Sequence, residues 1–204
     1  MNPQDTSIRL IVGLGNVGAE YERTRHNAGF WFVDAVARKA GANFGAERKF
    51  HGEVARLRDR GRELWLLKPA TYMNRSGQAV VSLALYYRIL PTQILVAHDE
   101  VDLMPGVVKL KRGGGTAGHN GLKDTQAKLS TPDFWRLRIG VGHPRTLALT
   151  QEVADFVLHP PSRAHEASID ESIDRALDIL PLLVEGQFER AMMKLHAAPK
   201  TPAP

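Results

Sequence analysis

The sequence predicts a single α/β domain, a sandwich in which helices flank a mixed, largely parallel central sheet. Three observations predict this fold. Apolar runs of strand length alternate along the chain with longer segments whose apolar residues recur at helical spacing. A chain of 204 residues can bury a sizeable core without disulfides or a structural metal. No internal repeat or linker divides it, so we expect one domain over residues 1–196 and a disordered tail at 197–204.

The individual elements follow from local patterns. Ile8 to Leu14 is an apolar run bounded by glycine, which predicts a buried strand, and Asn27 opens a helix that ends near Gly41. The later elements are expected in this order: a hairpin of strands at 52–58 and 63–67, a helix at 76–89, a buried strand at 93–97, a half-exposed strand at 107–111, a helix at 121–129, a strand at 135–141, and helical structure from 161 to about 195.

The composition excludes several classes of protein. The chain has no cysteine, which removes a disulfide framework, a cysteine-ligated zinc site and a thiol nucleophile. Its first residues lack the pattern of a signal peptide, and no stretch holds 18 uncharged apolar residues. We therefore expect a soluble cytoplasmic protein with no membrane partner.

Basic charge is concentrated in one part of the chain. The net charge is +5 overall, but residues 151–204 carry −4 and residues 1–150 carry +9. Residues 104–145 contain eight basic residues and only two acidic ones, Asp124 and Asp133. Such a surface attracts a polyanion through the release of counterions, although the same charges can also serve solubility alone. The charge distribution therefore has two interpretations: the protein binds a nucleic acid or another phosphate-bearing partner, or the charges only keep it soluble.

The segment Gly13-x-Gly15-x-x-Gly18 matches the dinucleotide-binding pattern after a strand. That site needs a helix that begins at the glycines and an acidic residue about 20 positions later. Here a charged loop follows the glycines, and Arg38 and Lys39 occupy the position of the acid. A nicotinamide oxidoreductase is thus an alternative with poor structural support.

Five polar residues stand where strands end or helices begin, namely Asn16, His26, Asn74, Asp99 and Asn120. In an open α/β sheet, ligands bind in the crevice beyond the carboxyl ends of the strands. Each residue alone has a structural explanation, because asparagine caps helices and a histidine can simply pack. Their joint placement predicts that they are neighbours in a functional site.

Water is the expected attacking group at this site, because the chain has neither a cysteine nor a Gly-x-Ser-x-Gly elbow. A histidine can accept a proton from water at neutral pH, and a carboxylate on its other nitrogen fixes the tautomer. We assign these roles to His26 and Asp99. The asparagine amides can donate to a developing oxyanion or hold the water.

Two further patterns concern metal and phosphate. None of the eight histidines forms a His-x-x-x-His or His-Glu-x-x-His pair, so we expect no metal site. The glycine-rich loop 113–118 follows Lys109, Lys111 and Arg112 and lacks the Gly-Lys-Ser/Thr of a nucleotide loop. Its backbone amides and the cations beside it suit a phosphate, but a mobile surface loop is an equal interpretation.

Taken together, five ordered motifs resemble those of the bacterial peptidyl-tRNA hydrolases. They cover the chain from about Ile8 to Leu195 and read Val12-Gly13-Leu14-Gly15-Asn16-x-Gly18 with Tyr21-x-x-Thr24-Arg25-His26-Asn27-Ala28-Gly29, then Thr71-Tyr72-Met73-Asn74-x-Ser76-Gly77, Val96-x-His98-Asp99-Glu100-x-Asp102, Gly118-His119-Asn120-Gly121-Leu122-Lys123, and Arg136-Leu137-Arg138-Ile139-Gly140-x-Gly142-His143-Pro144.

The resemblance implies hydrolysis of the ester between a peptide and the terminal ribose of tRNA by a monomer that needs neither metal nor cofactor. The expected contacts are with the acceptor stem, the 3′ end and the 5′-phosphate, and no DNA is expected. The resemblance implies these roles: His26 as base, Asp99 orienting it, Asn120 positioning the water, Asn16, Asn74 and Asn120 contacting the peptide and 3′ end, Met73 lining the peptide groove, Tyr21 near the 3′ end, and Lys111 with Arg138 clamping the 5′-phosphate beside Lys109.

Three positions depart from the family pattern: Val17 replaces a proline, Arg75 an apolar residue and Ala117 a glycine. Ala117 matters only if its backbone needs a positive φ angle. A non-catalytic tRNA- or RNA-binding module remains the alternative function, since a basic face alone would serve it.

Overall fold

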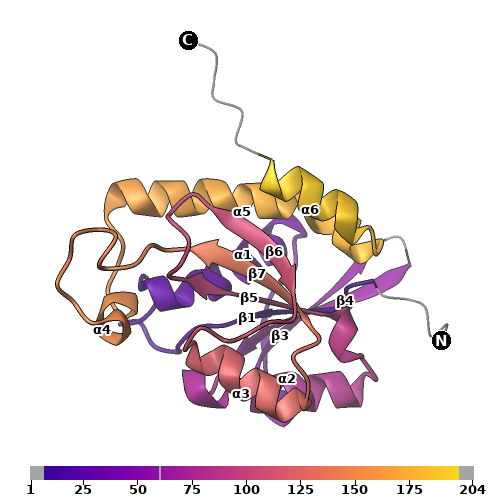
Figure 1. Ribbon diagram of the computed structural model, residues 1–204. Helices are drawn as coiled ribbons and strands as arrows, with labels where there is room; N and C mark the ends of the chain where they lie inside the picture. The colour runs from indigo at the N-terminus through magenta and orange to yellow at the C-terminus, as the bar shows by residue number, and fades with distance from the viewer. Residues whose placement is uncertain (1–6, 60, 198–204) are drawn as a thin grey trace.

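The protein, described here as a computed structural model over residues 7–59 and 61–197, is built on one twisted sheet (Figure 1). Within those residues the sheet has seven strands in the order β2-β3-β4-β1-β5-β7-β6. Their bounds are β1 Leu10–Gly13, β2 Gly45–Glu47, β3 Gly52–Asp59, β4 Arg62–Pro69, β5 Ile94–Glu100, β6 Val108–Arg112 and β7 Trp135–Gly140.

Parallel pairing is confined to the centre of the sheet. Strands β4, β1, β5 and β7 run parallel, whereas β2, β3 and β6 add antiparallel edges. The expected mixed sheet is confirmed, and the predicted hairpin is β3–β4. Because the four parallel strands end on one side, the residues that follow them meet there.

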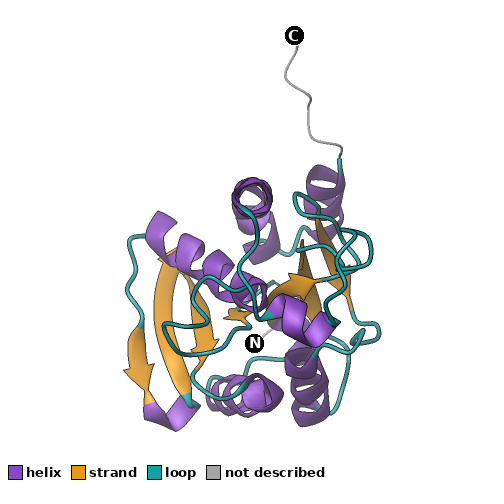
Figure 2. Ribbon diagram, turned by 90° about the vertical axis from the view of Figure 1, so that its left-hand side faces the viewer, coloured by secondary structure: helices purple, strands orange, loops and turns teal. Residues whose placement is uncertain are grey.

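Helices cover both faces of the sheet, and Figure 2 shows them on either side of the strands. One apolar core lies under α1 (Ala28–Lys39), α5 (Arg163–Val184) and α6 (Phe188–His196). A second core lies under α2 (Ser76–Tyr86) and α3 (Asn120–Leu129). The short helix α4 (Val153–Val157) lies at the end of the sheet opposite α6 in Figure 1. The fold is a three-layer sandwich.

The first turn of α1 lies directly against the sheet. A Cβ atom on Gly29 would be only 2.3 Å from the carbonyl oxygen of Ala97, and one on Gly13 would be 2.4 Å from the carbonyl oxygen of Gly29. Only glycine permits this approach. It brings the 3₁₀ turn Arg25–Asn27, which leads into α1, to the end of β5.

Several elements differ from the sequence prediction. The short edge strand β2 and the helix α4 were not predicted, because each is too short for a repeating pattern of apolar residues to be recognised. The C-terminal helical region is two helices, because Gly186 takes a positive φ of 74° between α5 and α6. Strand β5 continues to Glu100 and so includes Asp99. The predicted tail lies outside the described residues except for Ala197.

Helix α6 covers the edge strand β6. The backbone N–H of Leu110 donates to Nε2 of His196 at 2.9 Å, and Phe188 stacks on Trp135 of β7 with ring centroids 4.0 Å apart. Over residues 7–59 and 61–197, no helix combines the length and the apolar character needed to cross a membrane.

Candidate active site

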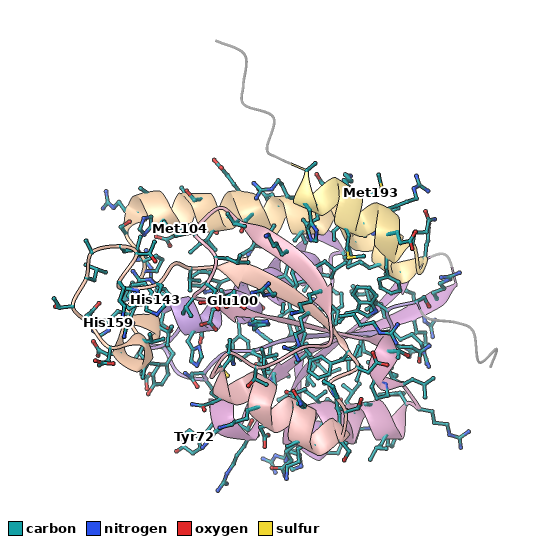
Figure 3. The ribbon with its side chains drawn as sticks, viewed as in Figure 1. Tyr72, Glu100, Met104, His143, His159 and Met193 are labelled. Atoms are coloured by element: carbon teal, nitrogen blue, oxygen red, sulfur yellow. The ribbon has the colours of Figure 1, made fainter. Side chains whose placement is uncertain are left out.

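A cavity of about 640 Å³ opens at the carboxyl ends of the parallel strands. Five of the residues proposed from the sequence line it: Asn16, His26, Met73, Asp99 and Asn120. Figure 3 shows Glu100 and His143, two more lining residues, at this end of the sheet. Apolar side chains from α4 and its flanks complete the wall, among them Val153, Val157 and Leu158. We call this space the active-site cavity.

His26 and Asp99 form a hydrogen-bonded pair inside it. Nδ1 of His26 lies 2.9 Å from Oδ1 of Asp99, and the side chains are 13% and 3% exposed. Because the carboxylate accepts, the proton of the neutral imidazole lies on Nδ1 and the lone pair on Nε2. Among the described residues no group bonds Nε2, which leaves it free for water or substrate.

The pKa values of this pair follow from burial and mutual charge. Burial lowers the pKa of His26, but the charge and hydrogen bond of Asp99 outweigh burial and raise it above its usual value. Burial opposes ionisation of Asp99, yet the histidines at 26 and 119 hold the pKa of its carboxyl well below the usual range. At neutral pH Asp99 is therefore a carboxylate, and its charge stabilises the imidazolium that forms when His26 accepts a proton.

A second histidine shares this carboxylate. Nε2 of His119 lies 2.9 Å from the same Oδ1 of Asp99, and the His26 and His119 rings are 4.9 Å apart between centroids. Sequence reasoning assigned His119 no role. Its signals in the sequence were its position before Asn120 and its place in the motif Gly118–Lys123 that carries the family resemblance.

Three ligand atoms, on His26, Asp99 and His119, lie within 4.8 Å of one another. The two hydrogen bonds to Asp99 account for this proximity, because both histidine nitrogens that face the carboxylate act as donors. The expectation that the site needs no metal stays a prediction.

His98 also lines the active-site cavity and is buried. Burial lowers its pKa to about 3, so the ring is neutral at neutral pH. Its Nδ1 donates to the carbonyl oxygen of Asp99 at 2.6 Å, and its buried Nε2 has no partner among the described residues.

The loop that carries Asn16 is held by an asparagine next to the proposed base. Oδ1 of Asn27 accepts from the backbone N–H of Asn16 at 2.8 Å, and Nδ2 donates to the carbonyl oxygen of Asn16 at 2.9 Å. The sequence predicted Asn27 only as the opening of a helix. Its side chain instead fixes Asn16 relative to His26.

A second hollow of about 240 Å³ adjoins the active-site cavity, and Lys111, Arg136 and Arg138 line it. We call it the basic hollow. Residues Thr116 and Ala117 line both spaces. Arg138 donates through Nε to Glu100 at 2.8 Å, so one of the two proposed phosphate-binding cations is ion-paired.

Arg136, which sequence reasoning did not single out, holds the glycine-rich loop. Its guanidinium donates to the carbonyl oxygens of Gly114 and Gly115 at 2.6 Å each, and the side chain is buried. Ala117 in this loop has a positive φ of 47°, so this departure from the family pattern occupies a conformation that favours glycine.

A third hollow of about 480 Å³ touches the cavity at Asn16 and Leu158. Tyr21, Tyr72 and Arg75 line it, and we call it the tyrosine hollow. Tyr72 is 80% exposed and lies at the rim of this end of the molecule (Figure 3). The structure thus places Tyr21 next to the cavity rather than in it.

Two predicted site residues lie apart from these three spaces. Asn74 is exposed in the 3₁₀ turn Met73–Arg75 and is not among the lining residues of any of them. Lys109 is exposed on β6, where it pairs with Arg138 across the strands, and it also does not line the basic hollow.

Comparison with known proteins shows the family of this chain. The family model described as peptidyl-tRNA hydrolase matches residues 10–203. The peptidyl-tRNA hydrolase of Bordetella avium is 61% identical over 94% of this chain and 92% of its own length, and that of Cupriavidus pinatubonensis is 60% identical over 93% and 98%. The crystal structure of peptidyl-tRNA hydrolase from Acinetobacter baumannii superposes with a TM-score of 0.88 at 49% identity, covering 93% of this chain and 95% of that one. Neither a non-catalytic RNA-binding module nor a nicotinamide oxidoreductase accounts for a match of this extent. The chain belongs to the peptidyl-tRNA hydrolase family.

Proposed function

We propose that this hydrolase cleaves the ester of peptidyl-tRNA with a water molecule that His26 deprotonates. The observation that carries the proposal is the 2.9 Å contact between Nδ1 of His26 and Oδ1 of Asp99, which leaves Nε2 free on the wall of the cavity. Water gives a proton to Nε2 as its oxygen attacks the ester carbonyl. Asp99 stabilises the imidazolium that forms, and the proton then passes to the departing ribose oxygen.

Amide groups around His26 supply the remaining chemistry. Asn16 and Asn120 line the same cavity, and each amide can donate to the developing oxyanion or accept from the water. Asn16 is held in place by Asn27, so its position costs little reorganisation during the reaction. Met73 and the apolar residues of α4 suit the peptide part of the substrate.

The two smaller hollows suit the nucleotide parts. Lys111 and Arg138 in the basic hollow would bind the 5′-phosphate, with Arg138 exchanging Glu100 for the phosphate. Tyr21 in the tyrosine hollow would contact the 3′-terminal nucleotide. Asn74 and Lys109, both exposed nearby, would reach the RNA only from outside these spaces. We propose that the enzyme acts as a monomer in the cytoplasm, where peptidyl-tRNA arises.

The test is His26→Ala, assayed with an N-acetylated aminoacyl-tRNA by the release of free tRNA. Loss of the base should reduce kcat by roughly 10²–10⁴-fold, while the dissociation constant for the tRNA stays close to that of the parent. His143→Ala, a histidine in the same cavity without a contact to Asp99, is the matched control. Near-parent turnover by His26→Ala would show that another group activates the water.

A further inference from the structure

One oxygen atom in the active site accepts two histidine hydrogen bonds. Oδ1 of Asp99 receives Nδ1–H of His26 and Nε2–H of His119, each at 2.9 Å. The two donors come from different segments, one before α1 and one before α3. At 3% exposure, the carboxylate has little water to compete for this oxygen.

His119 is held in its tautomer by the helix that it begins. It is the N-cap of α3, and its Nδ1 accepts from the backbone N–H groups of Gly121 at 3.2 Å and Leu122 at 3.4 Å. A nitrogen that accepts carries no proton, so the proton of the neutral ring must be on Nε2, where it faces Asp99. One side chain thus bonds the helix start with one nitrogen and the catalytic carboxylate with the other.

We propose that His119 is a positioning residue. Because it donates a second hydrogen bond to Oδ1 of Asp99, it limits how strongly the carboxylate stabilises protonated His26. The inference rests on the proposed role of His26 as base. The bond from His119 to Asp99 also connects the start of α3, which carries Asn120, to His26. The same bond then affects both the basicity of His26 and the position of the Asn120 side chain.

The expected consequence is a change in pH dependence. A carboxylate oxygen that loses one of two donors becomes a stronger acceptor for the other. Without the His119 bond, Asp99 should hold the imidazolium of His26 more tightly, so the base becomes neutral only at higher pH. Other titratable groups facing this space are His98, Glu100, Asp102 and His143. Of these, His98 is buried and neutral, and Glu100 is paired with Arg138.

Two substitutions separate the two bonds of His119. His119→Asn keeps an oxygen near the place of Nδ1 and remains a good N-cap, but it is too short to reach Asp99. His119→Gln places an amide N–H near the position of Nε2 and loses the favoured cap. The Asn variant therefore removes the bond to the carboxylate, and the Gln variant removes the bond to the helix.

The readouts are the pH profile of kcat/KM and the titration of His26 followed by NMR of ring-labelled histidine. In His119→Asn both midpoints should move upward by roughly 0.5–1 pH unit, with melting temperature within a few degrees of the parent. In His119→Gln the midpoints should return toward the parent while the melting temperature falls. Ser162→Ala, which removes the N-cap of α5 far from the site, should lower stability and leave the His26 titration unchanged.

The NMR titration distinguishes this inference from the role of His26 in catalysis, because it measures His26 without turnover. A His26 titration unchanged in His119→Asn would overturn the inference even if His26→Ala is inactive. An equal loss of kcat/KM at every pH in His119→Asn, with no shift of the midpoint, would also overturn the inference, because the bond to Asp99 would then matter for activity without changing the basicity of His26.

Discussion

Replacing Asp99 with asparagine should lower kcat strongly while leaving the fold in place. The amide oxygen of asparagine can still accept from both His26 and His119, so the geometry and the tautomers are kept and only the charge is lost. A unit charge about 4 Å from the imidazolium contributes about 4 kcal/mol at an effective dielectric constant of about 20. Because the proton is only partly transferred in the transition state, about 2–4 kcal/mol should be lost, which is roughly 30- to 1000-fold in kcat.

The pH profile gives this substitution a second signature. Asp99 raises the pKa of His26 against the opposing effect of burial, so Asp99→Asn should lower that pKa. A general base works in its neutral form, so the parent loses activity as pH falls through the raised pKa. In the variant this acid limb should move to lower pH, and the deficit should be smallest in acid.

Steady-state release of tRNA from an N-acetylated aminoacyl-tRNA, measured between pH 5 and 9 (about the range in which His26 changes charge), checks both effects. Asp102→Asn is the matched control, because it removes a carboxylate from the same cavity without touching His26, and it should cost far less. An acid limb that stays in place in Asp99→Asn, or a parent-like kcat at neutral pH, would refute the role of the charge.

Three other perturbations are predicted. Burial lowers the pKa of His98 to about 3, so the folded protein binds a proton there less readily than the unfolded chain does. The free energy of unfolding should therefore be highest above the pKa of His98 in the unfolded chain and should fall as the pH decreases from that value toward 3. The loss should be about 2 kcal/mol at pH near 5, and urea unfolding of His98→Gln should show a weaker pH dependence than the parent. Gly29→Ala places a Cβ atom 2.3 Å from a backbone oxygen of β5, which should cost about 2 kcal/mol of unfolding free energy and lower kcat by displacing His26; a parent-like urea midpoint would contradict it. Lys111→Ala and Arg138→Ala should each reduce the slope of log affinity for tRNA against log salt by about 1, whereas an unchanged slope would move the phosphate site elsewhere.

The pairing of His26 with Asp99 could be predicted because it follows from a general property of α/β sheets. Asp99 lies at the end of β5 and His26 in the turn that begins the helix after β1, and parallel strands end on the same side. Their separation of 73 positions in the sequence did not prevent the prediction, because the topology of the sheet brings them together. The elements with long periodic patterns could be predicted for a different reason, because burial on one face repeats along the chain.

The role of His119 could not be predicted, because it depends on where α3 begins. The sequence predicted that start at residue 121, whereas the helix begins at Asn120 and makes His119 the cap. Arg136 was read as part of the basic surface, but its burial comes from the glycine-rich loop folding over it. Loop conformations of this kind depend on tertiary contacts that no local pattern encodes.

The bond between His196 and the backbone of β6 bears on how copies of the chain behave toward one another. An outermost strand with free N–H groups is a template on which another chain can add a strand. Helix α6 occupies that place and ties up the amide of Leu110. A chain truncated before α6 would keep every proposed catalytic side chain but would expose the unpaired edge of β6. We therefore expect the first effect of the truncation to be self-association rather than loss of catalysis.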